Sequence, residues 1–215
     1  APSRGLGDVY KRQGDRLIIP GLTDLHIHAP QYTFRSLGMD MELLEWLETN
    51  TFPEESKYKD AEYAKKAYEM FAEQLKKSAT VRACIFGTIH NEATLILMDL
   101  LEEAGLHTMV GKVNMDRNSP DYLCEPSAEA SAQATREWLK AVADRKYKNT
   151  RPILTPRFTP SCTDELMELL KEIQTETHLP MQSHLSENPG EIAWVKELCP
   201  WSEFYGDAYD LSLIH

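Results

Sequence analysis

Apolar and polar residues follow two different periods along the chain, and these periods predict alternating strands and helices. Apolar runs rich in β-branched residues predict strands, at 16–19 continuing into 23–27, 81–89, 108–115, 152–158 and 180–184. Apolar residues at helical spacing predict helices, at 60–77, 95–103, 127–145, 163–177 and from Asn188 onward. This alternation is typical of a parallel sheet with crossover helices.

One segment does not fit the alternation. Residues 42–52 are predicted to form an extra helix and loop inserted after the first strand. Trp46, within this insert, fits either a core position or a side chain that covers a site. The Glu- and Lys-rich face of 54–77 is expected to be solvated surface.

Polar side chains gather where the predicted strands end, and they are candidates for chemistry: His26, His28, His90, Arg157, His184 and Glu187. In parallel α/β folds the carboxyl ends of the strands carry the active site. Polar groups spread over several strand ends favour a (β/α)8 barrel over a doubly wound sheet, whose site gathers at one switch point. His90 fits either a lining residue or a hydrogen-bonded structural histidine.

Composition narrows the functional class. The chain has 215 residues, of which 42% are hydrophobic and 27% are charged, as in an ordered globular protein. Its net charge of −11, without a basic block, argues against nucleic-acid binding. No apolar run reaches the roughly 18 residues of a membrane span. The four cysteines are scattered without a CxxC pair, so neither a disulfide framework nor a thiolate zinc site is indicated.

Three histidines are the strongest chemical signal. His26 and His28 alternate with Ile27, and period two places both imidazoles on one face of a strand. With His184 from another strand end, they suit a divalent metal that keeps a position open for water. Glu187, three residues after His184, fits either a proton-transfer group or a favourable charge at a helix N-terminus.

Four segments carry a resemblance to a known family. They are PGLTDLHIHAPQY (20–32), LLEWLETNTFPEE (43–55), TPRFTPSC (155–162) and QSHLSEN (182–188). The first resembles the metal motif of the amidohydrolase superfamily, and all four, in this order and spacing, are similar to its guanine deaminase family. The resemblance covers roughly residues 16–210. It implies an α/β fold that is a partial TIM-type (β/α)8 barrel, with about the first five strand–helix units.

The resemblance also implies an activity and roles for individual residues. The activity is hydrolytic deamination of guanine to xanthine and ammonia, in a cytoplasmic homodimer with one zinc ion per site. His26, His28 and His184 would bind the zinc, and Glu187 would shuttle the proton. Gln31, Arg157 and Phe158 would hold the purine, while a further metal ligand is expected beyond this sequence. No nucleic-acid or membrane partner is expected.

Alternatives stay open at this point. One is a related aminohydrolase that acts on another purine, a pterin or a triazine ring, and another is a catalytically inactive partial-barrel module. Residues 1–13 and 211–215 resemble translated sequencing adaptors, so we expect the native part to span about 14–210 and to be cut at both ends. A partial barrel would expose strand edges and apolar faces, and we expect the chain alone to be poorly soluble.

Overall fold

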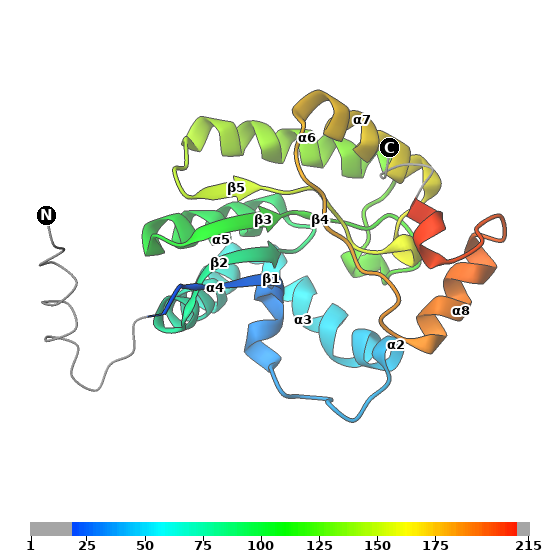
Figure 1. Cartoon of the computed structure of the whole chain (residues 1–215), viewed down its shortest axis with the longest axis horizontal. Helices are drawn as coiled ribbons and strands as arrows, with labels where there is room; N and C mark the ends of the chain where they lie inside the picture. The colour runs from blue at the N-terminus through cyan, green and yellow to red at the C-terminus, as the bar shows by residue number, and fades with distance from the viewer. Residues whose placement is uncertain (1–18, 210–215) are drawn as a thin grey trace, which may run out of the picture.

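A parallel sheet forms the centre of the molecule. The computed structural model describes residues 19–209, so the adaptor-like segments 1–13 and 211–215 lie outside the described residues. Four parallel strands lie in the order β1, β2, β3, β5 (Figure 1). Their bounds are Leu22–His28, Thr80–Phe86, His107–Gly111 and Thr150–Pro152. This parallel sheet with crossover helices confirms the predicted α/β class.

The third and fourth predicted strands are each interrupted. Beyond β3 and β5 the chain continues into a second parallel pair, β4 (Val113–Asn114) and β6 (Thr155–Pro156). The predicted fifth strand at 180–184 is reduced to a single bridge between Leu154 and Met181.

A missing donor explains why this fifth strand does not continue. Leu154 donates to the carbonyl of Pro180, and Gln182 donates to the carbonyl of Leu154, at 3.0 and 2.9 Å. The next rung of a parallel ladder would need an N–H from Pro156, and proline has none. His184 donates instead to the carbonyl of Arg157, at 3.2 Å.

The predicted helices are confirmed, with side-chain caps at four of their N-termini. The helices are α4 (Ala61–Lys77), α5 (Asn91–Ala104), α6 (Ala128–Arg145), α7 (Asp164–Thr177) and α8 (Pro189–Leu198). Asp60, Ser127, Thr163 and Asn188 accept hydrogen bonds from first-turn N–H groups. Asn188 and Glu191 form a capping box, which fixes the chain just after His184. None of the helices between residues 19 and 209 combines the length and the hydrophobicity of a membrane-spanning segment.

Short helical segments complete the fold. After β1 come the 3-10 helix η1 (Ala29–Phe34), α2 (Leu43–Trp46), the π-helical η2 (Leu47–Thr51), α3 (Phe52–Ser56) and η3 (Lys57–Lys59). Later 3-10 turns are η4 (Asp121–Leu123), η5 (Thr159–Ser161) and η6 (Tyr205–Tyr209). In Figure 1 the inserted α2 and α3 lie below the carboxyl end of β1.

The insert belongs to the packed body of the protein. Leu47 and Phe52 are buried in one cluster with Phe86, the last residue of β2, and Phe158, which follows β6. A larger cluster fills the space between the sheet and α4 and α5. The prediction that the charged face of 54–77 is solvated is wrong at its start, because Glu54 and Glu55 are buried.

Candidate active site

The end of β1 carries two histidines close together. Between Asp24, opposite Ala83, and Ile27, opposite Ile85, β1 holds one residue more than β2, which makes a β-bulge that includes His26. Bulges next to active sites re-aim a side chain. His28 follows in regular register, opposite Phe86, and the His26 and His28 rings are 5.2 Å apart. The predicted pair is therefore confirmed as neighbours.

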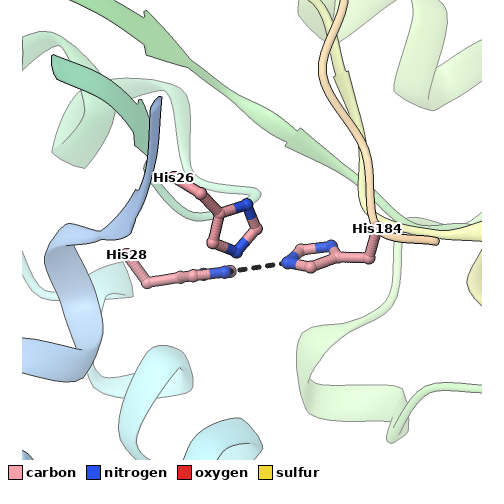
Figure 2. A group of neighbouring side chains, drawn as sticks. All are labelled: His26, His28 and His184. Carbon is pink, nitrogen blue, oxygen red and sulfur yellow. Dashed lines mark hydrogen bonds between the residues drawn. The ribbon is translucent and has the colours of Figure 1, made fainter. Parts of the chain in front are cut away.

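His184 meets this pair from the opposite side of the site. Figure 2 shows His26 and His28 entering from β1 and His184 from a distant segment, with the rings converging. One ligand nitrogen from each ring lies within 4.8 Å of the others. The Nε2 atoms of His28 and His184 are 2.9 Å apart. Two nitrogens on one tetrahedral zinc would lie roughly 3.3 Å apart, given Zn–N bonds of about 2.05 Å. The donor set therefore fits a divalent metal ion.

Hydrogen bonds fix the orientation of His184. Its Nδ1 donates to the carbonyl of Arg157 at 2.6 Å, which leaves the Nε2 lone pair for a metal. Its own carbonyl accepts a hydrogen bond of 2.6 Å from the hydroxyl of Tyr209. Ser183 Oγ also donates to the Arg157 carbonyl, at 3.1 Å. His184 is thus tied to its surroundings at both ring and backbone.

Loss of solvation lowers the pKa of all three imidazoles, which favours their neutral form. Desolvation lowers the pKa of His184 to about 3. Burial also lowers the pKa of His28 well below its usual value, and the nearby His184 and Arg157 add to the effect. For His26 burial lowers the pKa and Asp24 partly opposes this. The neutral imidazole is the form that binds a metal, so these rings are ready to bind at neutral pH.

Phe86 forms an aromatic floor under the histidines, and our sequence reasoning missed it. This fully buried ring stacks on His28 at 4.4 Å with an interplanar angle of 18°. It also lies 5.0 Å from the ring of His26 and 4.5 Å from that of His184. The apolar pattern predicts Phe86 inside a strand at 81–89, whereas β2 ends at Phe86 and so brings this ring to the edge of the sheet where the histidines lie.

One cavity of about 580 Å³ connects the predicted site residues. Its lining includes the three histidines together with Gln31, Arg157, Phe158 and Glu187. Trp46 of the insert also lines it, and Trp46 Nε1 donates to the carbonyl of Leu37 at 3.0 Å. His90 is not part of this lining. His90 directly precedes α5 and is half-buried. Within residues 19–209, its buried Nε2 has no hydrogen-bond partner.

Glu187 lies in a loop whose backbone is held in place. The N–H groups of Glu187 and Asn188 donate to Glu191 Oε2 at 2.7 and 3.3 Å, and Tyr205 donates to Glu191 Oε1. Burial raises the pKa of Glu187, and repulsion from Glu191 raises it further, while Arg157 opposes both. A raised pKa brings a carboxyl group closer to the neutral range in which it can both accept and donate a proton.

Arg157 has a partner that was not predicted. Its Nη1 donates to Glu55 Oε2 at 2.6 Å and its Nη2 donates to Glu55 Oε1 at 3.2 Å. Both side chains are almost fully buried, at 3% and 1% exposure. The sequence signal was present, because Glu55 ends one of the segments that carry the family resemblance.

Comparisons with known proteins agree on one family. Residues 17–206 match the Amidohydrolase family. The chain is 43% identical to guanine deaminase of Dictyostelium discoideum, covering 91% of this chain and 43% of that protein. It is 42% identical to guanine deaminase of Mus musculus, covering 89% of this chain and 42% of that protein. The chain thus spans about two fifths of the length of these curated relatives.

A solved structure matches most of this chain. It is guanine deaminase from C. acetobutylicum, with bound guanine in its active site. The TM-score is 0.86 at 46% identity, over 93% of this chain and 49% of that one. A triazine hydrolase at 15% identity and TM-score 0.70 shares the fold. The expectation of a partial (β/α)8 barrel is therefore confirmed.

Proposed function

The chain belongs to the amidohydrolase family, and we propose that the protein carrying it hydrolyses guanine to xanthine and ammonia. The observation that carries this proposal is one cavity that joins a three-histidine cluster to Gln31, Arg157, Phe158 and Glu187. The choice of substrate is supported by similarity to guanine deaminases, with 43% identity to that of Dictyostelium discoideum and 42% to that of Mus musculus.

The proposed cofactor is one zinc ion, with His26, His28 and His184 as its ligands from this chain. When bound, zinc lowers the pKa of a water molecule to about 7, so that a nucleophile is available at neutral pH. The lowered imidazole pKa values and the convergent nitrogens support this assignment.

Glu187 is the proposed proton carrier. Its carboxylate would accept a proton from the attacking water and deliver it to the amino group that leaves from C2 of guanine. The C2–N bond breaks, a C2–O bond forms, and the nitrogen leaves as ammonia. The raised pKa of Glu187 and its place in the cavity wall support this role.

The remaining residues would hold the purine. Arg157 can donate to the O6 and N7 acceptors of guanine, and Gln31 offers both a donor and an acceptor. Phe158 contributes apolar surface to the same cavity. From the family resemblance alone, we also propose a homodimer located in the cytoplasm.

Replacement of Glu187 tests the proposal. We expect Glu187→Gln to lower kcat for guanine by about 10²- to 10⁴-fold, the usual range for general acid–base groups. Ammonia release would give the rate, and elemental analysis would show unchanged metal content. Glu165→Gln, on the exposed face of α7, is the matched control and should behave like wild type. A wild-type protein that binds metal but releases no ammonia from guanine would contradict the proposed function.

A further inference from the structure

The Arg157–Glu55 pair connects two distant parts of the chain at the edge of the cavity. Arg157 follows β6, and Glu55 lies in α3 of the insert, 102 positions earlier in the sequence. Both oxygens of Glu55 accept from the guanidinium, so the contact is a bidentate fork. Such forks fix the direction of a guanidinium as well as its position.

Stability alone is a weak reason for this pair. Burying two charges costs free energy that their attraction repays only in part, and apolar residues of similar volume are often as stabilising. The two partners also differ in what they reach, since Arg157 lines the cavity and Glu55 does not. Glu55 therefore contacts a residue of the cavity wall without belonging to that wall.

The chain contains a second buried pair for comparison. Lys112 forms a hydrogen-bonded ion pair with Glu125, whose other oxygen accepts from Ser131 at 2.5 Å and from the N–H of Met115 at 3.2 Å. Neither Lys112 nor Glu125 lines the cavity. This pair ties the junction between β3 and β4 to the loop before α6, outside the lining of the cavity.

Two contacts restrict the Arg157 guanidinium. The carboxylate of Glu55 holds it in its plane, and the ring of Phe52, 5.3 Å from Arg157 Cζ, covers one face. Within residues 19–209, Glu55 is the only side chain that accepts a hydrogen bond from Arg157. A guanidinium carries more N–H donors than one carboxylate can accept, so donors remain for a ligand.

A fixed set of donors selects the substrate. A 6-oxopurine presents the O6 and N7 acceptors side by side, whereas a 6-aminopurine presents a donor beside N7. If the guanidinium cannot rotate, a 6-aminopurine would place its amino donor against one of the N–H donors of Arg157, which is unfavourable. Because Glu55 also neutralises Arg157, the pair offers directed hydrogen bonds without a net charge.

We propose that Glu55 is a specificity-determining positioning residue, which holds Arg157 so that its free N–H donors recognise a 6-oxopurine. This inference rests on the proposed function and adds to it a residue that does not itself touch the substrate. Arg157 itself touches both halves of the site, because its carbonyl accepts the Nδ1 hydrogen bond of His184 while its guanidinium is held by Glu55.

The test is Glu55→Gln in the protein that carries this sequence. We expect KM for guanine to rise roughly 10- to 100-fold, as for loss of a hydrogen bond to a charged group, with a smaller change in kcat. Binding of hypoxanthine and of adenine to the zinc-loaded protein, measured by calorimetry, gives a second readout. Hypoxanthine has the 6-oxo edge but no amino group to lose. The preference for hypoxanthine over adenine should shrink by a similar factor.

Glu125→Gln is the matched control, since it makes the same change in the other buried pair. It should lower the melting temperature and leave both KM and the hypoxanthine preference unchanged. If Glu55→Gln does not fold, Glu55→Asp keeps the charge and shortens the reach by one carbon, and the same shift is expected. Wild-type KM and purine preference in a folded Glu55 variant would overturn the inference while leaving the proposed function standing. A wild-type protein that neither deaminates guanine nor prefers hypoxanthine would overturn both.

Discussion

The two sides of the histidine cluster are built in different ways. On the β1 side His26 is exposed and His28 is partly buried, and within residues 19–209 the buried Nδ1 of His28 has no hydrogen-bond partner. On the opposite side His184 is buried and held by three hydrogen bonds. Its ring Nδ1 and its backbone N–H each donate one, and its carbonyl accepts one. The first side depends on strand geometry and on packing against Phe86, whereas the second depends on directed hydrogen bonds.

This difference separates two ways of orienting a metal ligand. A hydrogen bond fixes which nitrogen carries the proton and which one faces the metal. Packing against an aromatic ring fixes the plane of an imidazole but leaves its tautomer open. We therefore expect substitutions at His184 and its hydrogen-bond partners to affect which nitrogen binds the metal. Substitutions at Phe86 should instead affect the position of the His26 and His28 rings.

The largest effect should come from removing a ligand on either side. We expect His28→Ala and His184→Ala each to weaken zinc binding by more than about 100-fold, because each removes one of three convergent donors. Competition with a chromophoric chelator would measure the affinity. If only one of the two variants lost the metal, the cluster would not act as one site. His107→Ala, outside the cavity, is the control.

An intermediate effect should follow from removing the aromatic floor. We expect Phe86→Leu to weaken zinc binding roughly tenfold, since all three imidazoles lose a packed neighbour, and to cost roughly 1–3 kcal/mol of folding free energy. Chelator competition and denaturant unfolding would measure the two quantities. Leu97→Ala, in the core on the helix side of the sheet, should lose stability without a change in metal affinity. Unchanged affinity in a folded Phe86→Leu protein would show that packing does not orient the β1 side.

The smallest effect should come from a single hydroxyl on the hydrogen-bonded side. Tyr209→Phe removes the donor to the His184 carbonyl, and we expect zinc affinity to fall by a few-fold, with about 1 kcal/mol of lost stability. Isothermal titration with zinc would detect the change. Tyr147→Phe is the control, because its hydroxyl donates to Asp99 at 2.5 Å, away from the cavity. An equal loss of affinity in both variants would argue against a specific role for Tyr209.

Local sequence signals predicted most of the framework. Helical spacing and caps such as Asp60 and Asn188 identify helix starts, because capping depends on residues within one turn. Period two predicted His26 and His28 as neighbours on one face, and the rings are neighbours, although a β-bulge at His26 that the pattern did not predict interrupts the strand register. Positions at strand ends already singled out Arg157 and Glu187, the family resemblance added Gln31 and Phe158, and all four line one cavity.

What was missed depends on contacts between distant residues. In the sequence Glu55 belongs to a charged stretch that is typical of solvated surface. It is buried because the fold brings it against Arg157, which is far away in the sequence. Phe86 looks like any apolar strand residue until the three imidazoles gather on it. The residues that Glu55 and Phe86 contact lie too far away in the sequence for a local periodicity to reveal them.

The break in the ladder at Pro156 shows that a regular sheet and a metal site compete for the same backbone groups. Since proline ends the pairing after the Leu154–Met181 bridge, the N–H of His184 is free to bond to Arg157 one residue later than a regular ladder would place it. The same shift brings the imidazole of His184 to the Arg157 carbonyl. A longer and more stable strand here would hold His184 in another register, so selection for activity and selection for stability would act on Pro156 in opposite directions.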